Sequence, residues 1–173
     1  RSVMTTLTRS VHNFLDYLGK IESSLVTVIL SVMTVTVFLQ VFFRYVVKAS
    51  LPFSEELARY LMVWAVFIGA SMGARQGAHI GVEAIANLFP KSLKKFSIIL
   101  YGSFSVLFCI AITWLGFQVV SFIMQTGQKS PSMEIPMFYA YLAVPVGCML
   151  MGIRFIEATV YRYRDLQNRE GEK

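Results

Sequence analysis

The sequence predicts an all-α integral membrane protein with four transmembrane helices, because it carries few charges and contains four long apolar stretches. Of its 173 residues, 55% are hydrophobic and 15% are charged, whereas an ordinary soluble domain has about 25% charged residues. Three stretches contain no charged residue, at 23–43, 96–124 and 135–153, and a fourth, at 57–74, contains only Arg59. A helix needs about 20 apolar residues to cross a bilayer, so these stretches are the expected spans.

A short amphipathic helix is predicted at the N-terminus, in residues 1–20. Leu7, Val11 and Leu18 recur at helical spacing and contribute to one apolar stripe. A helix lying in the plane of the membrane interface fits this pattern. The alternative is a helical extension of the first span into water. The four-helix membrane domain is then expected at 21–163.

The first two spans are expected at about 23–47 and 55–75, on either side of a link that contains Pro52. Glu55 and Arg59 are four residues apart, so they should face each other on the second helix. For the charged residues near this link, contact with another protein competes with a lipid headgroup or a partner in the same helix. The candidate contacts with other subunits are Arg44, Glu55, Glu56, Arg59 and Trp64.

Other residues of these spans are expected to act in helix packing. Ser54 is a suitable N-cap for the second span, and Gln40 is polar enough to bond across helices. Glycines spaced four apart form a small-residue face, which lets two helices approach closely in lipid. These helix-packing glycines are Gly69, Gly73 and Gly77.

The remaining chain is expected to contain a second short interfacial helix, two more spans and a basic tail. The stripe in 82–89 predicts the interfacial helix, and Pro90 ends it. The last two spans are expected at about 94–124 and 135–158, joined by a polar loop. Residues 164–173 form the tail.

The distribution of basic residues predicts that both termini are cytoplasmic (N-in/C-in). With this orientation, twelve Lys and Arg residues lie inside, and only Arg44, Lys48 and Lys129 lie outside, which follows the positive-inside rule. Because the basic residues sit at span ends and not on one face, nucleic-acid binding is excluded. The expected cytoplasmic anchors are Arg75, His79, Lys94 and Lys95.

The sequence offers no catalytic, cofactor-binding or metal-binding residues. The three charge-free spans carry no ionisable acid or base, both histidines lie at or outside span ends, and Cys109 and Cys148 lack metal-ligand spacing. Transport by this chain alone is also disfavoured, because it shows no internal repeat and no charge at the middle of a span. These features leave a membrane scaffold or partner subunit, and not an enzyme.

Several short motifs, in a particular order, resemble a known family. They are Phe-Arg-Tyr at 43–45, Leu-Pro-Phe-Ser-Glu-Glu-Leu-Ala-Arg-Tyr at 51–60, Gly-Ala-His-Ile-Gly-Val-Glu at 77–83 and Tyr-Leu-Ala-Val-Pro-Val-Gly at 141–147. Together they resemble the DctQ-type small membrane subunit of tripartite ATP-independent periplasmic (TRAP) transporters. Phe53 and Glu83 depart from the residues the family often has, but both keep the physical character of those positions.

The resemblance implies a role in a bacterial inner (cytoplasmic) membrane complex. Its expected partners are a large elevator-type membrane subunit and a periplasmic binding protein that delivers an organic acid, such as a C4-dicarboxylate or sialic acid. Coupling to sodium would then belong to the large subunit, and this chain would need no cofactor of its own. The alternative is a membrane anchor for a redox or other peripheral enzyme complex.

Overall fold

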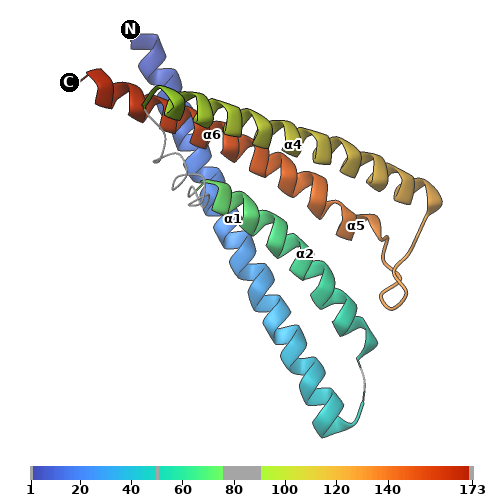
Figure 1. Cartoon of the computed structure of the whole chain (residues 1–173). Helices are drawn as coiled ribbons and strands as arrows, with labels where there is room; N and C mark the ends of the chain where they lie inside the picture. Colours follow the sequence, from blue (N-terminus) through green and yellow to red (C-terminus); the bar gives the residue numbers. More distant parts are fainter. Residues whose placement is uncertain (1, 50, 76–90, 172–173) are drawn as a thin grey trace. The chain divides into compact units, whose positions relative to one another are not determined.

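The computed structural model describes the backbone of residues 2–49, 51–75 and 91–171, and side chains within 15–49, 51–75 and 96–163. The described residues form helices and loops. In one of these loops, an isolated β-bridge pairs Lys129 with Pro136. The elements in chain order are α1 (Ser2–Phe42), the π-helix η1 (Phe43–Val47), α2 (Pro52–Arg75), α4 (Lys91–Thr126), α5 (Phe138–Tyr141) and α6 (Ala143–Gly171) (Figure 1).

Within the part of the chain that the structure describes, four helical segments are long and apolar enough to cross a membrane, as the sequence predicted. They are Leu15–Val47, Pro52–Arg75, Phe96–Thr126 and Phe138–Tyr163. The second begins three residues before the predicted start, and Ser54 is not its N-cap. The Ser54 hydroxyl donates instead to the carbonyl of Leu51 at 2.6 Å, inside the first turn that Pro52 opens. Proline suits that position because its missing N–H would have no helical partner there.

The predicted N-terminal helix is helical, but it is continuous with the first span. Helix α1 has 41 residues without a break, which at about 1.5 Å per residue gives roughly 60 Å, twice the hydrocarbon thickness of about 30 Å. This continuity corresponds to the alternative arrangement, a helical extension of the span. The predicted second interfacial helix at 82–89 lies outside the described residues.

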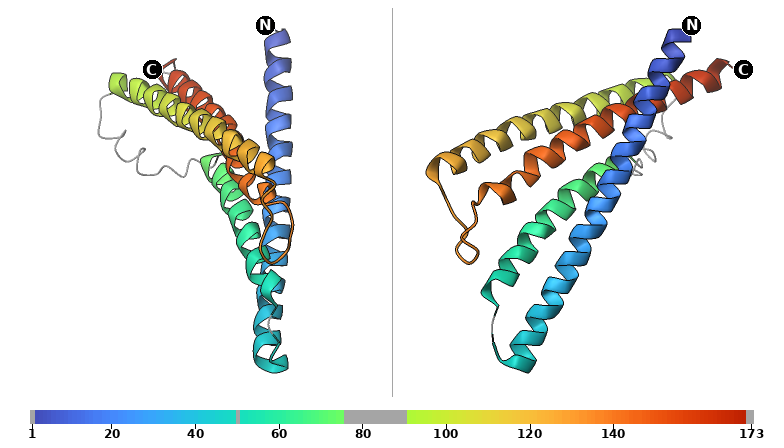
Figure 2. Two further views of the ribbon diagram at one scale, coloured as in Figure 1. Left: turned by 90° about the vertical axis from the view of Figure 1, so that its right-hand side faces the viewer. Right: turned by 180° about the vertical axis from the view of Figure 1, so that it is seen from behind.

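The chain forms two units, residues 1–65 and residues 66–173, and α2 contributes to both. In the first unit, the end of α1 and the start of α2 lie side by side and are joined by a short link (Figure 2). In the second unit, α4 and α6 run side by side along their length, and the short α5 precedes α6 (Figure 2).

Small residues bring the helices of the second unit close together. A Cβ built at Gly116 would lie 3.1 Å from Pro145, and one built at Gly152 would lie 3.3 Å from Cys109. Close approach at small residues is the usual basis of helix packing in lipid. The buried core of this unit includes Ala74, Cys109 and Phe155.

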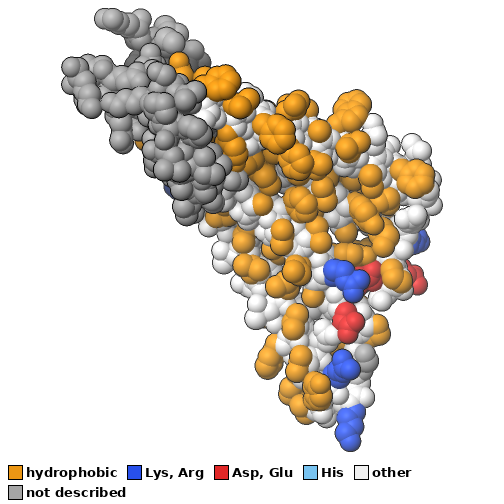
Figure 3. Space-filling model, viewed as in Figure 1, with side chains coloured by type: hydrophobic (Ala, Val, Ile, Leu, Met, Phe, Trp, Pro, Cys, Tyr) orange, Lys and Arg blue, Asp and Glu red, His pale blue; other side chains and the backbone are white. Residues whose placement is uncertain are grey.

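Large apolar side chains cover the outside of the helices (Figure 3). Phe104 is 70% exposed, and Trp114 is 68% exposed on the same helix. In water this much exposed apolar surface would drive aggregation. The lipid bilayer or the helices of a partner must therefore cover it.

Candidate functional site

The first candidate site lies where α1 passes into α2. The last turn of α1 widens into η1, and Lys48 follows with a left-handed backbone (φ 57°). The amide N–H of Ala49 donates to the carbonyl of Phe43 at 3.1 Å, which closes the end of this helix. Short π-helical turns are frequent at functional sites, and this one carries Arg44, which is exposed.

A hydrogen bond between side chains joins the two helices at this site. The side-chain amide of Gln40 donates to the Glu55 carboxylate at 2.8 Å, so the predicted cross-helix role of Gln40 is confirmed. Glu56 is 9% exposed and accepts a hydrogen bond from the hydroxyl of Tyr60. Both carboxylates of this site therefore have neutral partners.

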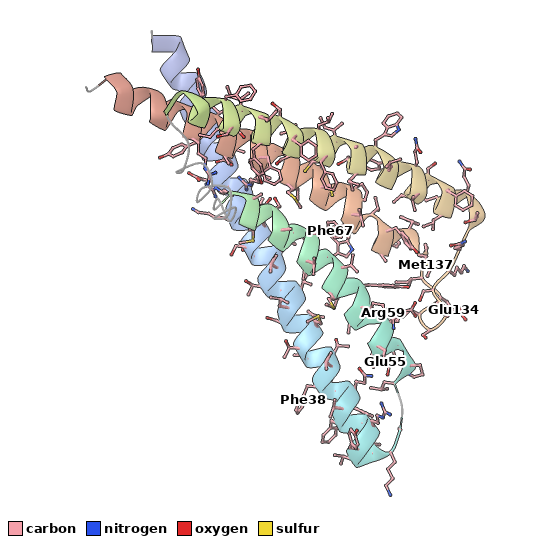
Figure 4. All side chains as sticks on the ribbon, viewed as in Figure 1. Phe38, Glu55, Arg59, Phe67, Glu134 and Met137 are labelled. Carbon is pink, nitrogen blue, oxygen red and sulfur yellow. The ribbon has the colours of Figure 1, made fainter. Side chains whose placement is uncertain are left out.

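Glu55 and Arg59 do not form the ion pair that their spacing allows. Glu55 bonds to Gln40 of the facing helix, whereas Arg59 lies one turn further along α2 (Figure 4) and is exposed. Helical spacing allowed the pair, but the bond to the neighbouring helix takes the carboxylate instead. Trp64, the remaining predicted contact, is half-buried.

A second polar cluster joins α2 to α6. The Nη1 atom of Arg154 lies 3.0 Å from Glu157, and the Nε atom of Arg75 lies 3.8 Å from the other oxygen of the same carboxylate. The Arg154 side chain is only 1% exposed. A charge buried so deeply needs close partners of opposite sign, and Glu157 provides one.

Sequence reasoning missed the core of this cluster. It singled out neither Arg154 nor Glu157 as a site residue, although their i, i+3 spacing was a usable signal. Arg75 was expected to be a cytoplasmic anchor, and its pairing with Glu157 places it in the cluster. His79 lies outside the described residues, and the side chains of Lys94 and Lys95 do as well. Another missed residue is Glu22, an acid that is only 3% exposed.

Among the described residues, the small-residue face of α2 has no packing partner at Gly69. A Cβ built there meets no atom within 4 Å. The buried residues of α2 in this region are Ile68, Ser71 and Ala74, which form a different face. Gly73 is half-buried, and Gly77 lies outside the described residues. A packing role for the three glycines therefore remains a prediction, and Gly69 is free to meet a partner.

The loop between α4 and α5 is tightly organised. The Ser130 N–H donates to the Ile135 carbonyl at 2.9 Å, and the Met137 N–H donates to the Gln128 carbonyl at 3.0 Å. Glu134, labelled in Figure 4, has a left-handed backbone (φ 56°) and an exposed side chain. Ser130 itself is 2% exposed, so its side chain is packed inside this loop.

Among the described residues, no group of three or more His, Cys, Asp or Glu is placed to hold a metal ion. Hydroxyl groups in the first span bond to their own helix: Thr27, Ser31 and Thr34 each donate to the carbonyl four residues earlier at 2.8 Å. These hydroxyl groups thus bond to the backbone of their own helix, whereas Gln40–Glu55 and Arg75–Glu157 join neighbouring helices. With its four long apolar helices, this arrangement defines a helical membrane protein.

Comparison with known proteins identifies the family. The model for the DctQ component of tripartite ATP-independent periplasmic transporters matches residues 33–165. The chain belongs to this family, which is a transporter component, as the sequence motifs indicated.

Individual relatives agree with this assignment. The chain is 34% identical to the C4-dicarboxylate TRAP transporter small permease protein DctQ of Rhodobacter capsulatus, over 62% of this chain and 48% of the relative. The chain thus spans about half the length of that relative. It is 25% identical to the ectoine TRAP transporter small permease protein TeaB of Halomonas elongata, over 80% of this chain and 72% of the relative.

A longer relative is the sialic acid TRAP transporter permease protein SiaT of Haemophilus influenzae. The identity is 26% over 87% of this chain, but the match occupies only 24% of the relative. The region similar to this chain is therefore one part of a much longer permease chain in that protein.

Proposed function

We propose that this chain is the small membrane subunit of a sodium-coupled TRAP transporter that imports an organic acid, and that it serves as a fixed scaffold for a large elevator-type subunit. The observation that carries the proposal is the family match over residues 33–165. The SiaT relative supports the large partner, because a segment similar to this chain is covalently joined there to a longer permease.

The contacts within each unit support a scaffold that holds its shape. In the first unit, the Gln40–Glu55 bond holds α1 to α2. In the second, the Arg75–Glu157–Arg154 cluster holds α2 to α6. The large exposed apolar surface of the helices leaves ample area for both lipid and a partner subunit, since close packing of apolar helices is what associates them in membranes.

The relatives also support a role that does not select the substrate. Their names refer to a C4-dicarboxylate, ectoine and sialic acid, which differ widely in size and charge. A subunit that contacted the substrate would need different polar groups for each. We therefore assign recognition of the substrate to the large subunit and to a periplasmic binding protein, and sodium binding to the large subunit.

We place the chain in the bacterial inner membrane with both termini in the cytoplasm. With the four spans found among the described residues, both ends would lie on one side, and the twelve basic residues on that side support its being the inside. The α4–α5 loop and the α1–α2 link then face the periplasm, where the loop is available to the binding protein.

The test is uptake into vesicles that contain the large subunit, with the binding protein and a labelled substrate outside. With this chain included, a sodium gradient should drive uptake, and the two membrane subunits should co-purify. Uptake at full rate without this chain would overturn the scaffold role. Uptake that needs the chain but ignores the sodium gradient would overturn the coupling.

A further inference from the structure

Helix α4 carries two faces, and only one of them packs against α6. On that face, a Cβ at Gly102 would collide with Thr159, and Cys109 lies beside Gly152. On the opposite face, eight exposed residues alternate three and four positions apart, a spacing that keeps them in one line along a helix. These residues, here called the α4 seam, are Leu100, Phe104, Leu107, Ala111, Trp114, Gln118, Ser121 and Gln125.

The polar residue Gln118 lies deep inside the span that carries the α4 seam. The span runs from Phe96 to Thr126, so eight residues separate Gln118 from its nearer end, a rise of about 12 Å. The hydrocarbon core is about 30 Å thick, which puts Gln118 close to its middle. A glutamine side chain is much shorter than 12 Å, and it therefore cannot reach the headgroups as a long basic side chain can.

Lipid alone is a poor cover for this face. The Gln118 side chain is exposed and forms no hydrogen bond within the part of the chain that the structure describes. Lipid tails have no group that could bond to its amide, and an amide in hydrocarbon without a partner is costly. Polar side chains inside a span generally face other protein or a water-filled cavity. We therefore expect another helix to cover the α4 seam.

The relatives indicate which protein supplies that helix. In the SiaT relative, a segment similar to this chain is joined to a longer permease in one polypeptide. The two parts are present there in equal numbers and in the same membrane, so a second copy of the small segment is not needed for a contact between them. A helix of the large permease subunit is the corresponding partner for a separate small subunit.

We propose that the α4 seam binds a transmembrane helix of the large permease subunit, whose polar side chain forms a hydrogen bond with the Gln118 amide near the middle of the membrane. This contact rests on the proposed function, which names the large subunit as the partner. The amide both donates and accepts hydrogen bonds, so an Asn, Gln, Ser or Thr side chain of the partner fits it. Ala111 is the small residue of the α4 seam at which the two helices can approach most closely.

Photocrosslinking tests the contact in the complex of the full chain with the large TRAP membrane subunit of the same organism. A photoreactive amino acid replaces Gln118 or, as the matched control, Val119. Val119 is also exposed and lies at the same depth, but it points about 100° away round the helix. Position 118 should crosslink to the large subunit in several times the yield of position 119. Equal yields, or a product of two copies of this chain from position 118, would overturn the proposal.

Substitutions in the α4 seam should weaken assembly without affecting the chain alone. Ala111→Trp should lower co-purification with the large subunit about tenfold, because it overfills a close contact between helices. Gln118→Leu should lower it about threefold, the effect of one lost hydrogen bond between membrane helices. Both positions are exposed, so the unfolding midpoint of the chain in detergent should stay the same. Val119→Trp is the control and should change neither quantity.

The outcomes separate this contact from the proposed function. If the unchanged chain co-purifies with the large subunit but Ala111→Trp and Gln118→Leu do so equally well, the α4 seam is not the interface. A lower unfolding midpoint in Ala111→Trp would also overturn the proposal, because the α4 seam would then pack inside this chain. If the unchanged chain itself fails to co-purify, the proposed function is overturned, and the contact with it.

Discussion

At the scale of single residues, two glutamates link neighbouring helices. Spacing along one helix would allow Glu55 to pair with Arg59, but Gln40 of the facing helix bonds to that carboxylate. Glu157 pairs with Arg154 of its own helix, which is 1% exposed, and its other oxygen lies 3.8 Å from Arg75 of α2. Local spacing predicts which pairs are possible within a helix, and packing against neighbouring helices decides among them.

Glu157→Gln should strongly destabilise the chain. It keeps the size of the side chain but removes the negative charge that faces Arg154 and Arg75. Leaving a buried charge without its partner costs about 3–5 kcal/mol, and other contacts of the two arginines reduce that to about 2–3 kcal/mol. Thermal unfolding in detergent should show a midpoint about 5–10 °C lower. Glu134→Gln, in an exposed loop position, is the control, and an equal shift there would contradict the role of the cluster.

Gln40→Leu should have a smaller effect, because it removes one hydrogen bond between helices. Such bonds contribute about 0.6 kcal/mol on average in membrane proteins. The Glu55 carboxylate is exposed, so water can replace the lost donor. We expect a shift of the unfolding midpoint of no more than about 3 °C. A loss as large as that of Glu157→Gln would show that the α1–α2 contact depends on this bond far more than its exposure indicates.

At the scale of helices, the four spans could be predicted from the sequence because length and hydropathy alone decide which segments enter a bilayer. The face that each helix presents to its neighbours could not. Apolar residues surround these helices on all sides, so the amphipathic pattern that reveals the buried face of a soluble helix is absent. The packing role of Gly69 and Gly73 therefore stays a prediction, and the buried positions of α2 in this region are Ile68, Ser71 and Ala74.

Gly147→Leu and Gly69→Leu should separate packing inside this chain from packing against a partner. A Cβ at Gly147 would collide with Phe67 of α2, whereas one at Gly69 meets open space. We expect Gly147→Leu to destabilise the isolated chain by about 1–3 kcal/mol through overpacking. Gly69→Leu should leave its unfolding midpoint unchanged but reduce co-purification with the large subunit.

Two results would contradict this interpretation. If Gly69→Leu neither destabilises the chain nor weakens co-purification, that position faces lipid, and the small-residue face has no packing role there. If Gly147→Leu leaves the unfolding midpoint unchanged, α2 and α6 do not pack closely at this point. A leucine at Gly102 of α4 would not be a neutral control for these two variants, because a Cβ there would collide with the side chain of Thr159.

At the scale of the whole molecule, the fold explains why the sequence indicated the family but not the substrate. The family model extends from the first span into the last helix, and the polar contacts described here join helix to helix. Relatives named for different substrates share this chain's sequence at 25–34% identity. The similarity therefore extends over a chain of membrane-spanning helices and not over one substrate, which agrees with the proposal that the partners carry the specificity.

The predicted orientation in the membrane can be tested by labelling the α4–α5 loop. Both termini should be cytoplasmic, so the α4–α5 loop should react with an impermeant thiol reagent added outside cells. Ser130 is a poor site for the label because it is 2% exposed, whereas the neighbouring Ser132 is exposed. In a background with Cys109→Ala and Cys148→Ala, Ser132→Cys should therefore be labelled in intact cells.

The matching control is Ser92→Cys, at the start of α4 beside the basic residues that should face the cytoplasm. It should be labelled only after the membrane is made permeable. Labelling of Ser92→Cys but not Ser132→Cys in intact cells would reverse the topology. The α4–α5 loop would be lost to any periplasmic partner, because a protein outside the membrane could not reach it.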